Sequence, residues 1–290
     1  MPELPEVETV VRGLQVVLPG RIILGVRLGK TDFIEDPVAI EEKLPGSRIL
    51  KVRRHGKFVV MELEWVNGTK QARTLLIHLG MTGQITTCSP EVPVPAHTHV
   101  FLSLDDGREI RYTDIRRFGH MRLIANDAQE SALGKLGLDP TEASEQEFIA
   151  KLSARQARVK ALLLDQHVLR GMGNIYTDES LWRARIHPRR IARNLTHEEH
   201  RRLFTAVRGV LSEAILLRGS SISDYVDAEG NPGEYQLRHR VYQREGEKCS
   251  RCKTLIRRET VAGRSSYFCP KCQRPPRKHG AGQTRKVKRA

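Results

Sequence analysis

The start of the chain carries apolar residues three or four positions apart, with mostly polar residues between them. This spacing places the apolar side chains on one face of a helix, and Pro19-Gly20 predicts where that helix ends. The apolar positions are Leu4, Val7, Val10, Val11, Leu14 and Val17. We therefore predict an amphipathic helix over residues 3–17.

The pattern changes after residue 20. Short runs now alternate between apolar and polar residues or are rich in β-branched side chains, and turn signals such as Asn67-Gly68 and Asp106-Gly107 separate them. The runs cover residues 22–28, 58–63, 74–78, 99–104, 109–113 and 120–124. Short strands with frequent turns predict a mostly antiparallel sandwich or barrel behind the helix.

Helical spacing returns in the second half of the chain. A polar, glycine-containing stretch precedes it, and we predict a linker at residues 126–144. The helical segments cover residues 145–152, 155–166, 175–183 and 196–218, and the polar residues 219–236 favour a mobile loop. The predicted fold class is α+β, with an N-terminal helix and antiparallel β-sandwich in residues 1–125 and a helical domain in residues 145–236.

Charge is divided unevenly between the two halves. Residues 1–150 hold 18 Lys and Arg against 21 Asp and Glu, a net charge of −3, whereas residues 151–290 hold 31 against 13, a net charge of +18. A polyanion is the natural partner of the second half, although a solvated basic surface without a specific ligand has the same composition. No apolar run approaches the ~18–20 residues of a membrane span, and the acidic N-terminus does not resemble a secretory signal. We therefore expect a cytoplasmic protein with no membrane partner.

Four of the five cysteines form two Cys-x-x-Cys pairs, separated by sixteen residues. They are Cys249, Cys252, Cys269 and Cys272. Two such pairs at this separation predict a zinc ribbon, because four thiolates suit tetrahedral zinc. Two disulfides or a redox pair are the alternatives. We place a zinc finger with one structural Zn²⁺ in residues 237–274, treat Cys88 as an ordinary thiol, and expect the basic tail 275–290 to be disordered.

The N-terminus combines a nucleophile with two acids. A small residue after Met1 normally allows the methionine to be removed, which leaves the secondary amine of Pro2 as the N-terminus. An α-amino group titrates near pH ~7.7–8.0, so a useful fraction is nucleophilic at neutral pH. This amine can condense with a sugar carbonyl carbon, and Glu3 and Glu6 lie beside it to move protons. Alternatively, these residues only begin a helix, because proline suits its first turn and acids its N-terminus.

A Gly-x-Gly-Asn turn at residues 171–174 joins two of the predicted helices. Glycines let backbone amides approach a phosphate, and the turn lies in the basic half of the chain. Asn174 also has the side chain of a helix cap. The turn therefore indicates either a phosphate site or a structural cap.

The opening Met1–Glu6, the turn 171–176 and the zinc ribbon, in this order, resemble the formamidopyrimidine-DNA glycosylase family. The resemblance spans residues 2–273. It implies a bacterial base-excision repair enzyme that removes oxidised purines such as 8-oxoguanine from damaged double-stranded DNA and cleaves the strand by β,δ-elimination. It also implies a helix–two-turn–helix in the helical domain and no redox or nucleotide cofactor. Nothing in the sequence suggests more than a monomer.

The resemblance assigns the chemistry to four residues. Pro2 matches the nucleophile that attacks C1′ and forms a Schiff base, and Glu3 matches the general acid/base, with Glu6 as a supporting carboxylate. Lys57 matches a lysine that contacts phosphate and assists elimination. Arg264 lies between the two cysteine pairs and matches the arginine at the hairpin tip that grips phosphates beside the lesion.

The resemblance also implies a surface that opens the duplex. Met81, Arg116 and Phe118 match an intercalating triad, because a duplex base must leave the stack before its glycosidic bond can be reached. Glycines flank Met81 and Phe118, which favours exposure over a place in the core. The expected phosphate contacts are His78, Arg117, Lys160 and Asn174. In the loop 219–236, the residues expected to read the base are Ser220, Ser221 and Tyr225.

Two departures from the family pattern stand out. Ile115 replaces the proline common in Asp-Pro-Arg-Arg-Phe-Gly, and the basic tail extends past the usual end. Two rival functions remain: an endonuclease VIII-like enzyme for oxidised pyrimidines, and a non-catalytic nucleic-acid-binding protein. Leu4 and the long loop 219–236 favour the purine enzyme over the first rival. Pro2 and Glu3 distinguish an enzyme from the second.

Overall fold

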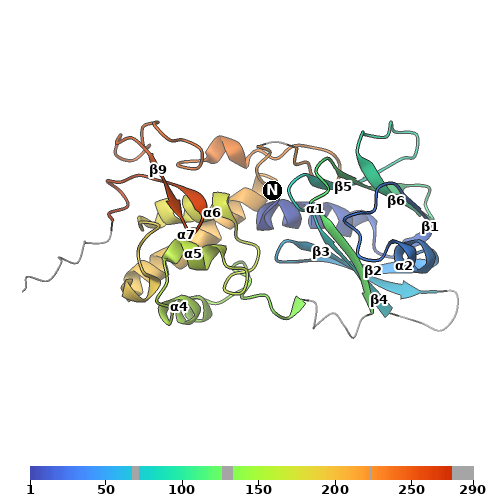
Figure 1. Ribbon diagram of the computed structural model, residues 1–290, viewed down its shortest axis with the longest axis horizontal. Coiled ribbons are helices and arrows are strands. Elements are labelled where there is room, and N and C mark those ends of the chain that lie inside the picture. Colours follow the sequence, from blue (N-terminus) through green and yellow to red (C-terminus); the bar gives the residue numbers. More distant parts are fainter. Residues whose placement is uncertain (67–71, 126–132, 223, 276–290) are drawn as a thin grey trace, which may run out of the picture.

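The computed structural model describes residues 1–66, 72–125, 133–222 and 224–275. Its β-sheet lies at one end of the molecule and the helices of residues 145–216 (α4 to α7) and a small β-hairpin lie at the other, with the N-terminus between them (Figure 1). Part of the predicted linker and all but the first residue of the predicted tail fall outside the described residues. Within the described residues, no helix is both long and apolar enough to cross a membrane.

Helix α1 (Leu4–Val17) joins the two ends of the molecule. A capping box starts it: the Glu3 side chain accepts from the Glu6 backbone, and the Glu3 amide donates to Glu6 Oε2 at 2.8 Å. Leu4 belongs to the apolar cluster of the helical part, whereas Val7 and the later buried apolar residues of α1 belong to the sandwich core. The first residues of the chain therefore lie at the junction of two hydrophobic cores.

Eight of the described strands form one antiparallel sheet in the order β5-β7-β6-β1-β2-β3-β4-β8. They are β1 (Ile22–Leu28), β2 (Ser47–His55), β3 (Phe58–Trp65), β4 (Ala72–His78), β5 (Gly83–Cys88), β6 (Thr98–Leu104), β7 (Glu109–Asp114) and β8 (His120–Ala125). The β1–β2 pairing is limited to Ile22↔Arg48 and Ile23↔Ser47. The sheet thus divides there into two halves, and apolar residues from both, with α1, form one core. This confirms the predicted β-sandwich; β2, β5 and helix α2 (Pro37–Lys43) were not predicted.

The helical part contains four α-helices within its described residues. They are α4 (Glu145–Ser153), α5 (Val159–Leu164), α6 (Asn174–Ala184) and α7 (His197–Leu216), with short 3-10 turns η2 (Ala192–Asn194) and η3 (Tyr235–Arg238). The helix predicted over residues 155–166 is shorter, because Arg158 is extended and forms an antiparallel bridge with Ile191. The described part of segment 219–236 packs against α1, where the Tyr225 hydroxyl donates to the Glu6 carbonyl at 3.2 Å.

A two-stranded hairpin, β9 (Arg257–Val261) and β10 (Arg264–Phe268), follows the helices. It lies beside α6 at the far end from the sheet (Figure 1). Buried carboxylates of α6 bind this C-terminal region: Asp178 Oδ2 accepts from the Tyr267 amide at 2.9 Å, and Glu179 accepts from the amides of residues 240–242 at 2.9 Å. Helix α6 therefore fixes the position of the hairpin relative to the helical core.

Candidate active site

Pro2 is buried where the two cores meet. It borders a small cavity of about 30 Å³. The lining residues are Met1, Pro2, Glu6, Met81, Ile175, Ser220, Ile222 and Tyr225. The fold thus brings together the predicted nucleophile, one residue of the predicted intercalating triad and part of segment 219–236. A cavity of this size holds about one water molecule, so a nucleotide requires the cavity to open.

Glu3 caps helix α6 from outside that helix. Its carboxylate accepts hydrogen bonds from the amides of Ile175 at 3.1 Å and Tyr176 at 3.5 Å. Gly173 makes this approach possible, because a Cβ there would lie 2.2 Å from the Glu3 carboxyl carbon. Burial raises the pKa of Glu3 to about 7, opposed by the charge of Lys57 and reinforced by that of Glu6. A carboxyl with this pKa exchanges protons near neutral pH, as a general acid/base requires.

Glu6 is the centre of a buried hydrogen-bond cluster. Its Oε1 accepts from the Ser220 amide at 2.8 Å and from the Tyr176 hydroxyl, and its Oε2 accepts from the Glu3 amide. Burial raises its pKa, although these hydrogen bonds oppose the shift. Burial and the nearby Glu6 carboxyl also hold the pKa of Tyr176 well above its usual range. Glu6 therefore connects α1, α6 and segment 219–236 as well as bordering the Pro2 cavity.

Lys57 comes from the turn between β2 and β3 and is only 8% exposed. Burial lowers the pKa of its amine, while the charges of Glu3 and Glu6 oppose the change. Arg264, exposed at the turn of the β9–β10 hairpin, also lowers the pKa of Lys57 through charge repulsion. Lys57 from the sheet thus interacts electrostatically both with the two glutamates and with Arg264 of the hairpin.

Two loops beside the cavity present apolar side chains outward. Met81 is 38% exposed and Phe118 is 57% exposed, and the Arg116 guanidinium lies 4.4 Å from the centre of the Phe118 ring. The structure confirms that Met81 and Phe118 are exposed. Buried Asp114 joins the loops: its Oδ1 accepts from the Thr82 hydroxyl at 2.5 Å and from the Arg116 amide at 3.2 Å.

Asp114 was not singled out from the sequence, although it directly precedes the exposed loop. Its Oδ2 accepts from the Tyr112 hydroxyl at 3.1 Å and from the Gly119 amide at 2.9 Å. A Cβ on Gly80 would lie 2.3 Å from the Phe118 carbonyl, so the two loops touch through their backbones. The rigid contact between the loops fixes the spacing of Met81 and Phe118.

His78 and Arg117 flank these loops and are both engaged within the protein. His78 Nδ1 accepts from the Gly80 amide at 3.1 Å, and burial with the charges of Lys57 and His120 lowers its pKa to about 4. Arg117 Nε donates to Asp32 at 2.8 Å, a partly exposed pair. A phosphate at this position therefore meets a neutral imidazole and an arginine that already has a carboxylate partner.

The four predicted zinc ligands lie together. All four sulfur atoms are within 4.8 Å of one another, with 3.3 Å between Cys252 and Cys269 and 4.0 Å between Cys249 and Cys272. A tetrahedral Zn²⁺ with bonds of about 2.3 Å places its sulfur ligands about 3.8 Å apart. The cluster therefore fits one structural Zn²⁺. Four thiolates leave no open position for water, so the metal holds the hairpin and takes no part in a reaction.

Comparisons with known proteins agree with this geometry. A model of the formamidopyrimidine-DNA glycosylase N-terminal domain matches residues 1–121, and a model of that enzyme's H2TH domain matches residues 136–226. A model of a zinc finger found in FPG and IleRS matches residues 246–275. The formamidopyrimidine-DNA glycosylase of Pelotomaculum thermopropionicum is 44% identical over 280 residues, which cover 94% of this chain and 99% of that protein.

The chain belongs to the formamidopyrimidine-DNA glycosylase family. The Solibacter usitatus formamidopyrimidine-DNA glycosylase is 45% identical over 94% of this chain and 100% of its own length. Two solved structures of Lactococcus lactis Fpg, one with DNA containing an abasic site and one with DNA containing N7-benzyl-Fapy-dG, are each 33% identical and cover 94% of this chain and 100% of theirs. Their TM-scores are 0.85 and 0.84. The predicted family and α+β fold are therefore confirmed.

Lys160 of this family member lies in the interior, and the prediction that it contacts phosphate is wrong. Its side chain is 0% exposed, and its Nζ donates to Asp178 Oδ1 at 2.7 Å and to the Ser265 carbonyl at 2.8 Å. The partners lie 18 and 105 positions further along the chain, on other elements, so the sequence did not reveal them. Lys160 instead connects α5 to α6 and to the start of β10, directly beside Arg264.

Asn174 does not cap α6, so the interpretation of Asn174 as a structural helix cap is wrong. It is the first residue of the helix, Gly173 is the N-cap residue, and the glycosylase uses Glu3 as the capping anion. The Asn174 side chain instead donates to the Ser265 carbonyl at 2.9 Å. The α6 N-terminus is therefore occupied by a catalytic candidate, and Asn174, like Lys160, binds the zinc hairpin.

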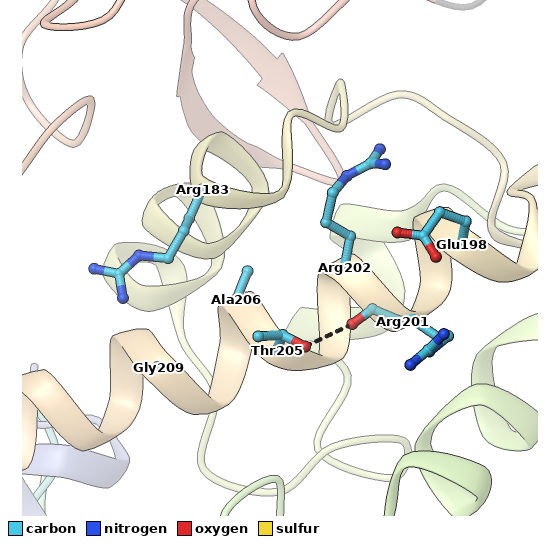
Figure 2. Close-up of a pocket in the computed structure, with 7 residues that line it drawn as sticks. All are labelled: Arg183, Glu198, Arg201, Arg202, Thr205, Ala206 and Gly209. Carbon is cyan, nitrogen blue, oxygen red and sulfur yellow. Dashed lines mark hydrogen bonds between the residues drawn. The ribbon is translucent and has the colours of Figure 1, made fainter.

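The open pocket between α6 and α7 is separate from this site. It has a volume of about 450 Å³, and its three arginines point in different directions (Figure 2). Arg183 pairs with Glu213 at 2.5 Å, Arg201 with Glu145 at 3.1 Å, and Arg202 donates to the Ala184 carbonyl at 2.9 Å. None of the predicted catalytic residues, all of which the structure describes, lines this pocket.

Proposed function

We propose that Pro2 is the nucleophile of this bifunctional DNA glycosylase/AP lyase, which removes oxidised purines in base-excision repair. The observation that carries the proposal is the arrangement at the N-terminus: Pro2 borders a cavity shared with Glu6 and with the exposed Met81 loop. The next residue in the chain is Glu3, whose pKa is raised to about 7. The relatives named as glycosylases favour this enzyme over a non-catalytic nucleic-acid-binding protein.

The proposed roles are those that the family resemblance implies, and the geometry of the site supports them. The amine of Pro2 attacks C1′, the base leaves, and the sugar ring opens to a Schiff base. Glu3 supplies and removes protons, and Lys57, a buried amine whose pKa is lowered, assists β- and δ-elimination. Zn²⁺ bound by the four cysteines holds the hairpin so that Arg264 reaches the phosphates beside the lesion.

We propose damaged double-stranded DNA as the partner, since Lactococcus lactis Fpg is solved with DNA that contains an abasic site or N7-benzyl-Fapy-dG. Met81, Arg116 and Phe118 enter the duplex, because apolar wedges and an arginine offset the cost of unstacking, a few kcal/mol. His78, Arg117 and Asn174 are proposed to contact the backbone. We further propose a monomer in the bacterial cytoplasm, divided into residues 1–125, the linker 126–144, residues 145–236, the finger 237–274 and the tail 275–290.

Borohydride trapping tests the proposed function. Protein whose mature N-terminus has been confirmed by mass is incubated with a duplex containing 8-oxoguanine opposite cytosine, and the expected result is a covalent adduct mapped to Pro2. Binding without an adduct on any lesion would contradict the proposal. An adduct formed only with thymine glycol would instead assign the endonuclease VIII-like activity.

A second prediction concerns the buried ion pair between Lys160 and Asp178, which lies next to Arg264 of the hairpin. Replacing Lys160 by methionine leaves buried Asp178 without its cation and removes one of the two side-chain donors of the Ser265 carbonyl, so stability is expected to fall by about 3 kcal/mol. DNA affinity at fixed salt is expected to fall about tenfold, equivalent to about 1.4 kcal/mol, because the hairpin loses an anchor beside Arg264. Lys151→Met on α4 is the matched control, because it removes the same charge from another helix. Equal losses of stability and of DNA affinity in both variants would show that only the net charge matters.

A further inference from the structure

A chain of hydrogen-bonding side chains leads from Glu6 away from Pro2. The Tyr176 hydroxyl contacts Glu6 Oε1, and the same hydroxyl lies 3.4 Å from Ser220 Oγ. Ser220 Oγ in turn lies 3.1 Å from His239 Nε2. Each of these groups except the carboxylate both donates and accepts a hydrogen bond, so the chain is continuous for proton transfer.

The two ends of this chain lie in different surroundings. Glu6 borders the small cavity shared with Pro2. His239 borders an open surface pocket of about 580 Å³ on its other side, with residues such as Tyr242 and Gln243. The links between them are buried: Tyr176 is 0% exposed and Ser220 is 5% exposed. The chain therefore joins an enclosed site to solvent through the interior.

The proposed reaction consumes a proton that must enter this enclosed site. The nitrogen of neutral Pro2 forms a bond to C1′, and the C1′–base bond breaks; the base keeps the bonding pair and takes up the proton that the nitrogen loses. The nitrogen lone pair then forms the iminium as the C1′–O4′ bond breaks. O4′ keeps that pair and takes up one proton, which balances the positive charge of the iminium. One proton from outside is thus needed for each Schiff base.

We propose that His239, Ser220 and Tyr176 form a proton relay that supplies Glu6, and through it the cavity beside Pro2, from the open pocket. This inference rests on the proposed function. Glu6 accepts the Tyr176 proton, Tyr176 accepts that of Ser220, and Ser220 accepts the Nε2 proton of His239. His239 then takes a proton from water at Nδ1, so the net transfer is one proton from solvent to Glu6.

The electrostatics of His239 and Glu6, the two ends of the relay, agree with proton transfer from His239 toward Glu6. Burial and the charge of Arg244 lower the pKa of His239 to about 4, so the ring is neutral at pH 7 and offers one donor and one acceptor nitrogen. Burial raises the pKa of Glu6, which favours the protonated carboxyl that the relay produces. The T-shaped contacts of His239 with Tyr235 and Tyr242, each with ring centres 5.6 Å apart, hold the imidazole in place.

Two substitutions separate proton transfer from simple positioning of Ser220. His239→Gln keeps a side-chain hydrogen bond to Ser220 but cannot pass a proton from one atom to another, whereas His239→Leu removes both. The single-turnover rate of strand cleavage at 8-oxoguanine is measured in mixtures of H₂O and D₂O. We expect a curved dependence on the D₂O fraction for the wild type, because several protons move together. Both variants should be slowed about tenfold or more and give a straight line.

The control is Gln243→Ala, which changes a residue of the same pocket outside the relay and should keep the wild-type rate and curvature. A His239→Gln variant with the wild-type rate would overturn the relay and leave His239 a positioning residue. A straight line for the wild type would overturn it without any variant, even if both substitutions impaired folding. Failure of the proposed function is distinguished by the absence of any wild-type cleavage or borohydride adduct.

Discussion

Replacement of Glu3 by glutamine is expected to abolish base excision while making the folded protein more stable above pH 7. The rate should fall by a factor of about 10²–10⁴ or more, because glutamine cannot give or take the proton. The amide side chain would keep an oxygen that accepts from the α6 amides, so the helix cap is retained. Single-turnover excision of 8-oxoguanine and urea unfolding, measured on the same preparations, test both parts.

The stability gain follows from the raised pKa of Glu3. Its carboxyl has a pKa of about 7 in the folded chain against an ordinary value of 4.5. Between these pH values the folded state keeps a proton that the unfolded state has released, so stability falls as pH rises from 4.5 to about 7 and stays low above it. Glutamine removes this loss, which is on the order of 3 kcal/mol. The difference between variant and wild type should be large at about pH 8 and smaller at about pH 5.5.

Pro2→Gly is the matched control for the chemical part. Glycine leaves a primary amine in place of the secondary amine and does not touch Glu3, so excision should be lost without the pH-dependent gain in stability. DNA affinity should stay within a few-fold in both variants. Excision that survived in both would contradict the proposed mechanism. A Glu3→Gln protein no more stable than wild type at about pH 8 would contradict the raised pKa.

The parts of the site that sequence predicts are those in which neighbours along the chain act together. Pro2, Glu3 and Glu6 fall within about one helical turn, and their order alone suggested a nucleophile beside two acids. The four cysteines are recognisable by their spacing, and flanking glycines correctly indicated that Met81 and Phe118 are exposed. These signals need no knowledge of the fold.

The parts that sequence did not predict depend on partners far along the chain. Lys160 has the pattern of a surface charge, and only the Asp178 and Ser265 partners explain its burial. Asn174 has the right chemistry for a cap, but Glu3 reaches the α6 amides from about 172 positions away. A residue's intrinsic preference is therefore overridden wherever tertiary contacts satisfy the same backbone groups.

The missed strands have local physical reasons. Strand β2 carries a bulge between Ile49 and Lys51, which interrupts the alternation of apolar and polar residues. Its later residues include two arginines. Arg53 donates to Glu62 and Arg54 to Glu8, and these ion pairs allow charged residues in the strand. Strand β5 is short and polar and lies at the edge of the sheet, paired with β7. Periodicity carries little information in either case.

Removal of Zn²⁺ is expected to unfold the finger and to lower DNA affinity at least about 100-fold, a loss of about 2.8 kcal/mol. The apolar cluster beneath the cysteines is small, with Trp182, Val241 and Ile256 as its other buried members among the described residues. Such a core does not hold a fold without its metal, whose binding free energy is about 10–16 kcal/mol in isolated zinc fingers. Zinc content, limited proteolysis and DNA affinity after chelation test this expectation.

The loss of affinity has a structural cause that distinguishes it from general unfolding. The hairpin that Zn²⁺ holds gives the Ser265 carbonyl to Lys160 and Asn174 and the Tyr267 amide to Asp178. Without Zn²⁺ to hold the hairpin, Arg264 is no longer fixed near Lys57. The sandwich core, by contrast, contains no residue of the finger among the described residues. We therefore expect the sandwich to stay folded and the salt dependence of binding to become shallower, because fewer phosphates are neutralised. The control is Cys88→Ser in β5, which should leave zinc content and DNA affinity unchanged. Metal-free protein that kept its full DNA affinity would show that Arg264 does not grip the phosphates.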